Sequence, residues 1–181
     1  MDVTTWLSKA HAEFRRLRSG ELADNLRAQG ISYRIIWGLE SYRLKEIAQI
    51  FLADETLTIE GRRLLANALW DEDVRESKML ATRLYPTGEM SELLANEWAS
   101  AIQYTELADQ ACMNLFARLP FAATLANAWA RDEASAMKQY AAMQLALRLD
   151  LTELRETASA IAQNTANPLW LRHAASRVEQ N

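Results

Sequence analysis

Leu65-Ala66-Asn67-Ala68-Leu69-Trp70 returns as Leu94-Ala95-Asn96-Glu97-Trp98 and again as Leu125-Ala126-Asn127-Ala128-Trp129. The asparagines of the three copies lie 29 and then 31 positions apart. Each copy is followed by a second stretch whose apolar residues recur at helical spacing. A period of about 30 residues with two helices per unit is typical of an α-solenoid, because neither helix of a unit can bury its apolar stripe without the neighbouring unit.

The rest of the chain fits the same helical plan. Gly (5) and Pro (3) are scarce among the 181 residues, and strong helix formers such as Ala, Leu, Glu and Arg recur throughout. The β-branched and aromatic stretch 31–38 is predicted to be an extended connector packed on the core. We predict an all-α fold, an α-α superhelix (HEAT-like or ARM-like solenoid) of antiparallel helix pairs, with residues 1–181 forming a single domain. Helices are predicted at about residues 5–18, 19–30, 41–52, 58–70, 72–85, 88–101, 104–118, 121–130, 133–149, 151–163 and 168–179.

Several helix starts carry capping residues. Ser19 is predicted to cap the second helix, and Asn167 to cap the last one, in which Pro168 takes the first helical position. The acidic stretches 71–73 and 132–133 are predicted to cap the helices that follow them.

Composition excludes several classes of function. No run of 18 apolar residues is present, so we expect no membrane span, and charged residues within positions 1–17 argue against a signal peptide. Cys112 stands alone among apolar neighbours, which predicts a buried, inert thiol, and neither His11 nor His173 has a second histidine four positions on. Five glycines form no phosphate-binding loop. We therefore expect a cytoplasmic protein with no metal and no cofactor.

The six tryptophans fall roughly one to each helix pair. Trp70, Trp98 and Trp129 share the repeat spacing and are predicted to be buried wedges between units. Trp37 lies in the connector, where it is better placed to face a ligand.

The charge distribution leaves two kinds of macromolecular partner open. The net charge is −4, but residues 1–50 hold eight Lys/Arg against six Asp/Glu, which allows a local basic surface and no global one. Arg75 and Lys78 share a helix face, and on the concave wall of a solenoid they suit phosphates, as Tyr140 suits stacking on bases. The alternative is a solvated charged face paired with nearby glutamates.

A pair of carboxylates is the best candidate for chemistry. Glu106 and Asp109 are three positions apart on one helix face, directly after Tyr104. Two carboxylates can divide acid and base work when burial separates their pKa values. The alternative is that both complement the helix dipole.

Two segments resemble a known family. Gly38-Leu39-Glu40-Ser41-Tyr42-Arg43-Leu44-Lys45-Glu46-Ile47-Ala48 is similar to G-[IV]-x-x-P-x-L-R-x-[IL]-A of the AlkD-like DNA alkylation repair family. Leu69-Trp70 followed by Glu76, Lys78, Leu80 and Ala81 resembles that family's L-W-x5-E-x-R-x-L-A. The likeness runs in order over about residues 30–150 and implies a HEAT-like fold.

The resemblance also implies an activity and a site. Enzymes of the family release alkylated purines by glycosidic hydrolysis, using a Trp-Asp-x-x-Asp segment and an Arg on the following repeat. Asp109 matches the essential Asp, which stabilises positive charge on the sugar. Thr105 stands at the Trp position, and Gln139 or Tyr140 stands where the Arg is expected.

Further departures concern the basic residues. Lys45 and Lys78 replace usual arginines, and Tyr42 replaces the Pro. Our leading hypothesis is a protein that binds DNA or another protein on its concave face without full glycosylase activity, using Lys45, Arg75, Lys78 and Tyr140. The competing hypothesis is an active alkylpurine glycosylase in which Asp109 carries catalysis with help from Glu106 and Tyr104.

Overall fold

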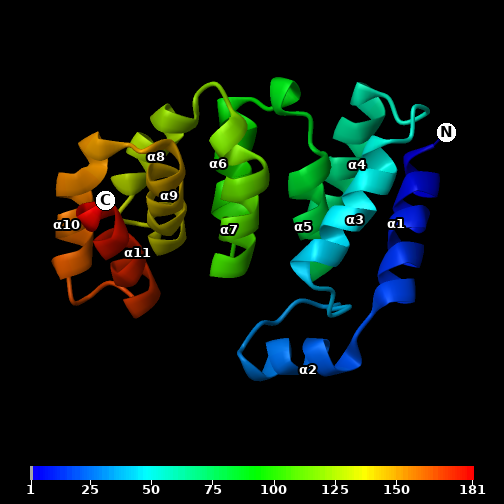
Figure 1. Cartoon of the computed structure of the whole chain (residues 1–181), viewed down its shortest axis with the longest axis horizontal. Helices are drawn as coiled ribbons and strands as arrows, with labels where there is room; N and C mark the ends of the chain where they lie inside the picture. The colour runs from blue at the N-terminus through cyan, green and yellow to red at the C-terminus, as the bar shows by residue number, and fades with distance from the viewer. Residues whose placement is uncertain (1) are drawn as a thin grey trace. The chain divides into compact units, whose positions relative to one another are not determined.

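The computed structural model describes residues 2–181, and over these residues the fold is all-α. Successive helices pack in pairs, as in α-α superhelical folds, and the described residues include no β-strand (Figure 1). The chain divides into two compact units, residues 1–89 and 90–181. The single domain over residues 1–181 stays a prediction.

The first unit holds five α-helices and a short 3₁₀ helix, η1 (Thr87–Glu89). Helix α5 packs against α3 and α4, and α1 lies on the same group with its Trp6, Ala10 and Phe14 buried. The connector after α2 is extended, as predicted, and Ile35 forms an isolated parallel bridge with Val74. The α-helices are α1 (Val3–Leu17), α2 (Gly20–Ala28), α3 (Ser41–Leu52), α4 (Ile59–Asp71) and α5 (Arg75–Leu84).

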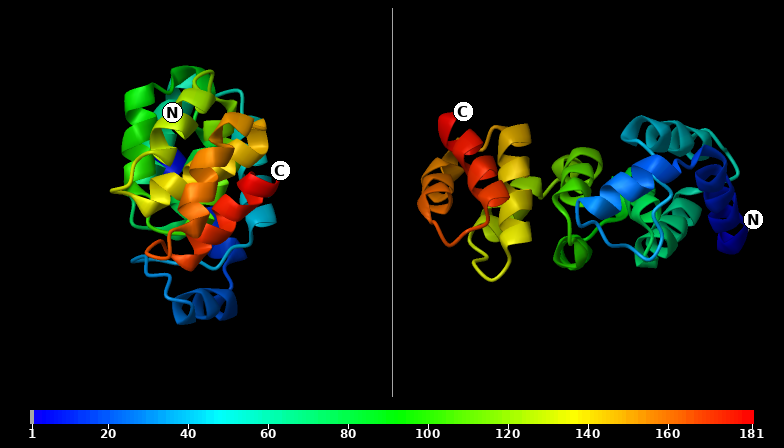
Figure 2. Two further views of the ribbon diagram at one scale, coloured as in Figure 1. Left: turned by 90° about the vertical axis from the view of Figure 1, so that its left-hand side faces the viewer. Right: turned by 90° about the horizontal axis from the view of Figure 1, so that it is seen from below.

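The second unit is organised around α9, which contacts α7, α8 and α11 (Figure 2). Every residue from Gln139 to Ala146 is buried, because α9 has neighbours on several sides. This burial decides the environment of the candidate site described below. The α-helices are α6 (Glu92–Ala101), α7 (Thr105–Asn114), α8 (Ala122–Ala130), α9 (Ala136–Leu149), α10 (Arg155–Gln163) and α11 (Leu169–Gln180), with 3₁₀ helices η2 (Phe116–Arg118) and η3 (Thr152–Leu154).

The three repeat copies occupy equivalent positions, on α4, α6 and α8, each directly before a second helix. Trp70, Trp98 and Trp129 are buried, as predicted. Within the second unit, Trp129 Nε1 donates a 2.6 Å hydrogen bond to Asn96 Oδ1, and the amide nitrogen of Asn96 donates to the Glu92 carbonyl. The asparagine of one copy therefore holds the tryptophan of the next.

Of the predicted helix caps, Ser19 is confirmed and the others are wrong. Ser19 caps α2 by accepting a hydrogen bond from the Leu22 amide, as predicted. Asn167 does not cap α11, since Pro168 is the N-cap and the Asn167 amide donates to the Ile161 carbonyl. The acidic stretches 71–73 and 132–133 are not caps either, because Val74 and Ser135 take the N-cap positions of α5 and α9.

Candidate functional site

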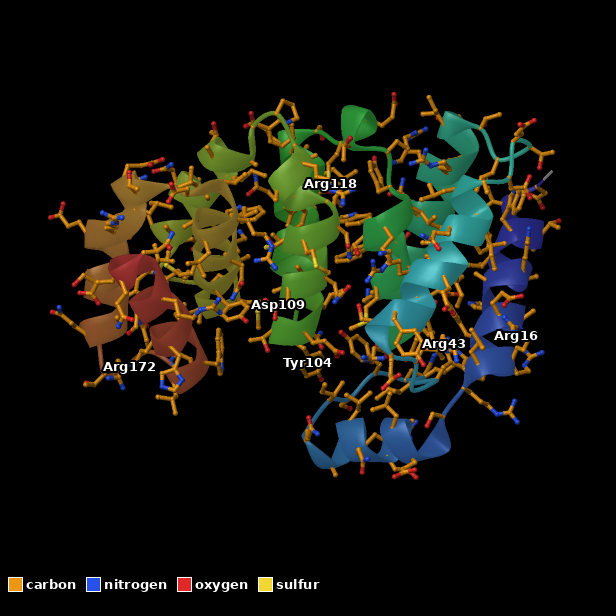
Figure 3. All side chains as sticks on the ribbon, viewed as in Figure 1. Arg16, Arg43, Tyr104, Asp109, Arg118 and Arg172 are labelled. Carbon is orange, nitrogen blue, oxygen red and sulfur yellow. The ribbon has the colours of Figure 1, made fainter. Side chains whose placement is uncertain are left out.

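Asp109 lies on the side of α7 that faces α9 and α11, while Tyr104 marks the start of the helix (Figure 3). Leu107, Ala108 and Ala111 turn into the core, so helical spacing leaves Asp109 at the edge of the buried face. Its Oδ1 accepts a 3.1 Å hydrogen bond from the Tyr140 hydroxyl of α9. The structure thus joins two residues that the sequence had singled out separately.

Burial controls the charge of this pair. Desolvation raises the pKa of Asp109, and the Tyr140 hydrogen bond and the Arg148 and Arg177 charges counteract part of that rise. Burial, together with the negative charge of Asp109, raises the pKa of Tyr140 to about 12, so the phenol keeps its proton and donates. Asp109 is therefore a partly desolvated carboxylate with one oxygen already hydrogen-bonded.

An aromatic and two arginines complete the surroundings of Asp109. Trp170 of α11 stacks edge-on against Tyr140, with 5.5 Å between ring centroids, and 38% of the residue is exposed. Arg148 and Arg177 are exposed and lie close enough to Asp109 for their charges to lower its pKa. We define the Asp109 surface as Asp109, Tyr140, Arg148, Trp170 and Arg177. An exposed indole packed on Tyr140, with two exposed guanidinium groups within electrostatic range of Asp109, has the chemistry of a nucleic-acid contact.

The other residues suggested around Asp109 take different roles. Glu106 is in the first turn of α7, where a carboxylate complements the helix dipole, and its charge contributes to the raised pKa of Asp109. Tyr104 is the N-cap residue of α7 and is half-buried. Gln139 is buried and donates its amide to the Ala130 carbonyl at the end of α8. It therefore takes up a structural hydrogen bond at a position where the resemblance expects an Arg.

Arg75 belongs to a buried network in the first unit. Its guanidinium donates 3.0 Å to the Leu39 carbonyl and 2.7 Å to Glu76 Oε1. The Glu76 carboxylate is fully buried and also accepts from the backbone amides of Trp37, Gly38 and Leu39. Arg75 was expected on an exposed wall, but only 4% of it is exposed, so its charge holds the connector in place.

Lys78 and Lys45 differ in how far their ammonium groups are exposed to a binding partner. Lys78 is half-buried and donates a 2.5 Å hydrogen bond to the Trp70 carbonyl near the end of α4, with its ammonium group over the Trp70 ring. Desolvation lowers its pKa. Lys45 is exposed on α3. Of the basic residues suggested from the sequence, Lys45 is the one whose charge reaches the surface of its unit.

Residues 2–181 hold no group of three or more His, Cys, Asp or Glu side chains that could bind a metal ion. Cys112 is buried and its Sγ lies 3.5 Å from the Ala141 carbonyl. Burial raises the pKa of this thiol well above its ordinary value. In the same described region, none of the helices combines the length and the apolar character that crossing a bilayer requires.

A family model described as DNA alkylation repair enzyme matches residues 10–176. The chain belongs to this family. Comparisons with curated proteins and with solved structures gave no match. The match to the family therefore extends over almost the whole chain, beyond the segments that carried the resemblance.

Sequence reasoning missed three members of the Asp109 surface: Arg148, Trp170 and Arg177. Arg148 and Arg177 lie outside every motif that was recognised, and Trp170 shares no repeat with Trp70, Trp98 and Trp129. The position of Trp170 directly after Pro168-Leu169, in the first turn of α11, is the one signal that sets it apart from the buried tryptophans.

Proposed function

We propose that this alkylation repair family member binds DNA through the Asp109 surface, without full glycosylase activity. The observation that carries the proposal is that the exposed Trp170 ring packs on Tyr140, whose partner Asp109 lies within electrostatic range of the exposed Arg148 and Arg177. Guanidinium groups bind backbone phosphates, and an exposed indole offers a face on which a base can stack. Lys45, which is exposed in the first unit, is proposed separately as a phosphate contact of that unit.

Weak glycosylase activity follows from what replaces the family's catalytic partners. Thr105 has no aromatic ring to offer at the Trp position. Gln139 and Tyr140 are buried and engaged in hydrogen bonds inside the unit, so neither substitutes for a phosphate-binding Arg. The Tyr140 hydroxyl also stabilises negative charge on Asp109 Oδ1, which leaves less of that charge for a cationic sugar.

DNA binding is tested by fluorescence anisotropy with a labelled duplex over a range of salt concentrations. The variant Arg148→Ala/Arg177→Ala is expected to bind more weakly and to lower the salt slope by up to about 0.9 for each arginine that contacts a phosphate. Arg155→Ala, which removes an exposed arginine at the start of α10, is the matched control. Equal loss of DNA affinity in both variants would mean that the binding does not depend on the Asp109 surface.

A protein partner is the alternative to DNA, and the acidic balance of the chain favours it. Absence of DNA binding by the wild type at low salt would refute the DNA proposal and leave this alternative.

The second candidate function is alkylpurine release with Asp109 as the catalytic carboxylate, supported by Glu106 and Tyr104. It is favoured by the half-buried position of Asp109 beside exposed basic residues. Its test is release of methylated bases from alkylated DNA by the wild type and by Asp109→Asn. The enzymatic hypothesis requires release by the wild type and its loss in the variant. No release by the wild type refutes it.

A further inference from the structure

Helix α9 carries three polar side chains, one helical turn apart, in a row that reaches Asp109. Tyr140, Gln144 and Arg148 are spaced by four positions, so they lie on one face of the helix. Gln144 is in the middle of the row, and only 6% of it is exposed. The other residues at positions 141–146 are apolar. A polar side chain buried in such surroundings is held by its hydrogen bonds, and these decide what it does.

The Gln144 amide lies between its two polar neighbours. Arg148 Nη1 donates to Gln144 Oε1 at 3.0 Å and to the Gln144 carbonyl at 3.2 Å. A guanidinium group can only donate, so the amide oxygen faces Arg148 and the NH₂ group points the other way. There the amide hydrogen-bonds to Tyr140 and counteracts part of the rise in the pKa of Tyr140. An amide has this effect when its NH₂ group donates to the phenolic oxygen, because that bond favours the charged form.

These bonds have one direction, from Arg148 through Gln144 and Tyr140 to Asp109. The last of them is the 3.1 Å bond that the Tyr140 hydroxyl donates to Asp109 Oδ1. Both ends impose this direction, because a guanidinium group has no acceptor and an ionised carboxylate has no donor. The two middle groups each accept from one side and donate to the other, and such a sequence polarises and strengthens its own bonds. We call Arg148, Gln144, Tyr140 and Asp109 the Gln144 relay.

The relay leaves Arg148 able to bind an anion. The bonds to Gln144 use Nη1 alone, and the Arg148 side chain is exposed. Its Nε and Nη2 form an edge of the guanidinium group that can bind a phosphate with two parallel hydrogen bonds. A long side chain loses rotamer freedom when it binds, and one that is already held loses less. The bond to Gln144 therefore lowers the entropic cost of binding a phosphate at Arg148.

We infer that Gln144 is the positioning residue of the Asp109 surface: it holds Arg148 for a backbone phosphate and directs the Tyr140 hydroxyl to Asp109. The first part rests on the proposed DNA binding, whereas the second concerns the free protein. Gln144 is buried and acts through its two neighbours.

The pKa of Asp109 reports on the relay. The titratable groups around Asp109 come from three helices: Glu106 and Cys112 of α7, Tyr140 and Arg148 of α9, and Arg177 of α11. Of the three groups that lower the pKa of Asp109, Tyr140 and Arg148 belong to the relay. Methionine in place of Gln144 has a similar volume but neither donates to Tyr140 nor holds Arg148. Tyr140 then becomes a weaker donor and Arg148 can turn away, so the pKa of Asp109 is expected to rise.

The test compares Gln144→Met with Gln139→Met in a carboxyl NMR titration. Gln139 is a matched control, because it is also on α9, is also 6% exposed and donates to the Ala130 carbonyl of α8, outside the relay. The pKa of Asp109 is expected to rise in Gln144→Met and to stay at the wild-type value in Gln139→Met. An unchanged pKa of Asp109 in Gln144→Met overturns the inference, because a side chain that only fills space would give that result.

Fluorescence anisotropy with the labelled duplex tests the Arg148 end of the relay. Gln144→Met is expected to weaken DNA binding about two- to tenfold, as the loss of one hydrogen bond implies, and to cause no further loss when added to Arg148→Ala. Equal weakening in both backgrounds overturns the positioning of Arg148. A wild type that binds no DNA refutes the proposed function, and the pKa comparison then decides on its own whether Gln144 directs Tyr140 to Asp109.

A measurement on the wild type covers the case in which Gln144→Met does not fold. Protonation of Asp109 removes the acceptor of Tyr140, so the side-chain amide signals of Gln144 are expected to shift with the same apparent pKa as the Asp109 carboxyl. The side-chain amide signals of Gln139 are expected to show no such step. Gln144 signals that do not follow the titration of Asp109 overturn the inference.

Discussion

Glu76→Gln tests how strongly one buried carboxylate holds the first unit together. In the wild type, Oε2 accepts from the Trp37 amide, and Oε1 accepts from the amides of Gly38 and Leu39 and from Arg75. A glutamine has one acceptor oxygen in place of two and directs an NH₂ group at donors on its other side. Even in its better orientation the Trp37 amide loses its partner, and the buried Arg75 loses its counter-charge.

The expected loss of unfolding free energy is about 3–5 kcal/mol, the range for removing one member of a buried ion pair. Hydrogen bonds to a charged acceptor contribute about 1.5–3 kcal/mol each, against about 1 kcal/mol for neutral ones, so weakening three and losing one gives a loss of at least about 3 kcal/mol. Because whole domains are stable by only about 5–15 kcal/mol, this loss is readily measured.

Urea denaturation of the wild type and Glu76→Gln measures the change. Glu60→Gln, which removes an exposed partner of Arg63, is the control and is expected to leave the midpoint of urea denaturation nearly unchanged, because water screens this pair. Hydrogen exchange at the amides of Trp37, Gly38 and Leu39 gives a local readout and is expected to accelerate in Glu76→Gln. Stability within about 1 kcal/mol of the wild type, with unchanged exchange, would refute the assigned role of Glu76.

Three further substitutions probe the connector and the Asp109 surface. Gly38→Ala is expected to destabilise by at least about 2 kcal/mol in urea, because φ is +72° and the new Cβ would meet the Ser19 carbonyl; a change below 0.5 kcal/mol, on the order of an ordinary surface substitution, contradicts this. Asp109→Asn is expected to raise the Tm at pH 7. Because the folded pKa of Asp109 is raised, ionisation of Asp109 costs stability above that pKa, and the cost disappears below the ordinary value of 3.8. The difference in Tm between Asp109→Asn and the wild type should therefore close towards pH 3. A lower Tm for Asp109→Asn than for the wild type at pH 7 refutes this. Tyr140→Phe is expected to raise the pKa of Asp109 further in a carboxyl NMR titration, since the lost hydrogen bond favoured the charged form, and a fall would contradict the assignment.

The helices could be predicted from the sequence because their signals are local. Ser41–Leu52 is helical over its predicted range, and the extended connector before it follows from its β-branched and aromatic residues. The predicted helix at 72–85 begins instead at Arg75, because Val74 pairs with Ile35 in an extended conformation. Such a contact between distant residues leaves no trace in helical periodicity.

The candidate site was only partly predictable for the same reason. The sequence of residues 75–77, Arg-Glu-Ser, is typical of a solvated helix face. These residues are buried because the connector, more than thirty positions earlier in the chain, covers them. Asp109 was identified by its place in a motif, but its pairing with Tyr140 depends on the packing of α7 on α9. Trp170 became a candidate only once its exposure beside Tyr140 was known.

The hydrogen bond from Trp129 to Asn96 restricts how the chain can tolerate insertions. Apolar stripes slide past one another at little cost, whereas an amide oxygen accepts from an indole only in one register. One extra residue inside α8 before Trp129 would swing its indole about 100° around the helix axis. The same residue placed in the turn at 131–134, beyond the tryptophan, would leave the bond intact. Length variation among related chains should therefore concentrate in such turns, while the helix segments that carry the asparagine and tryptophan keep their spacing.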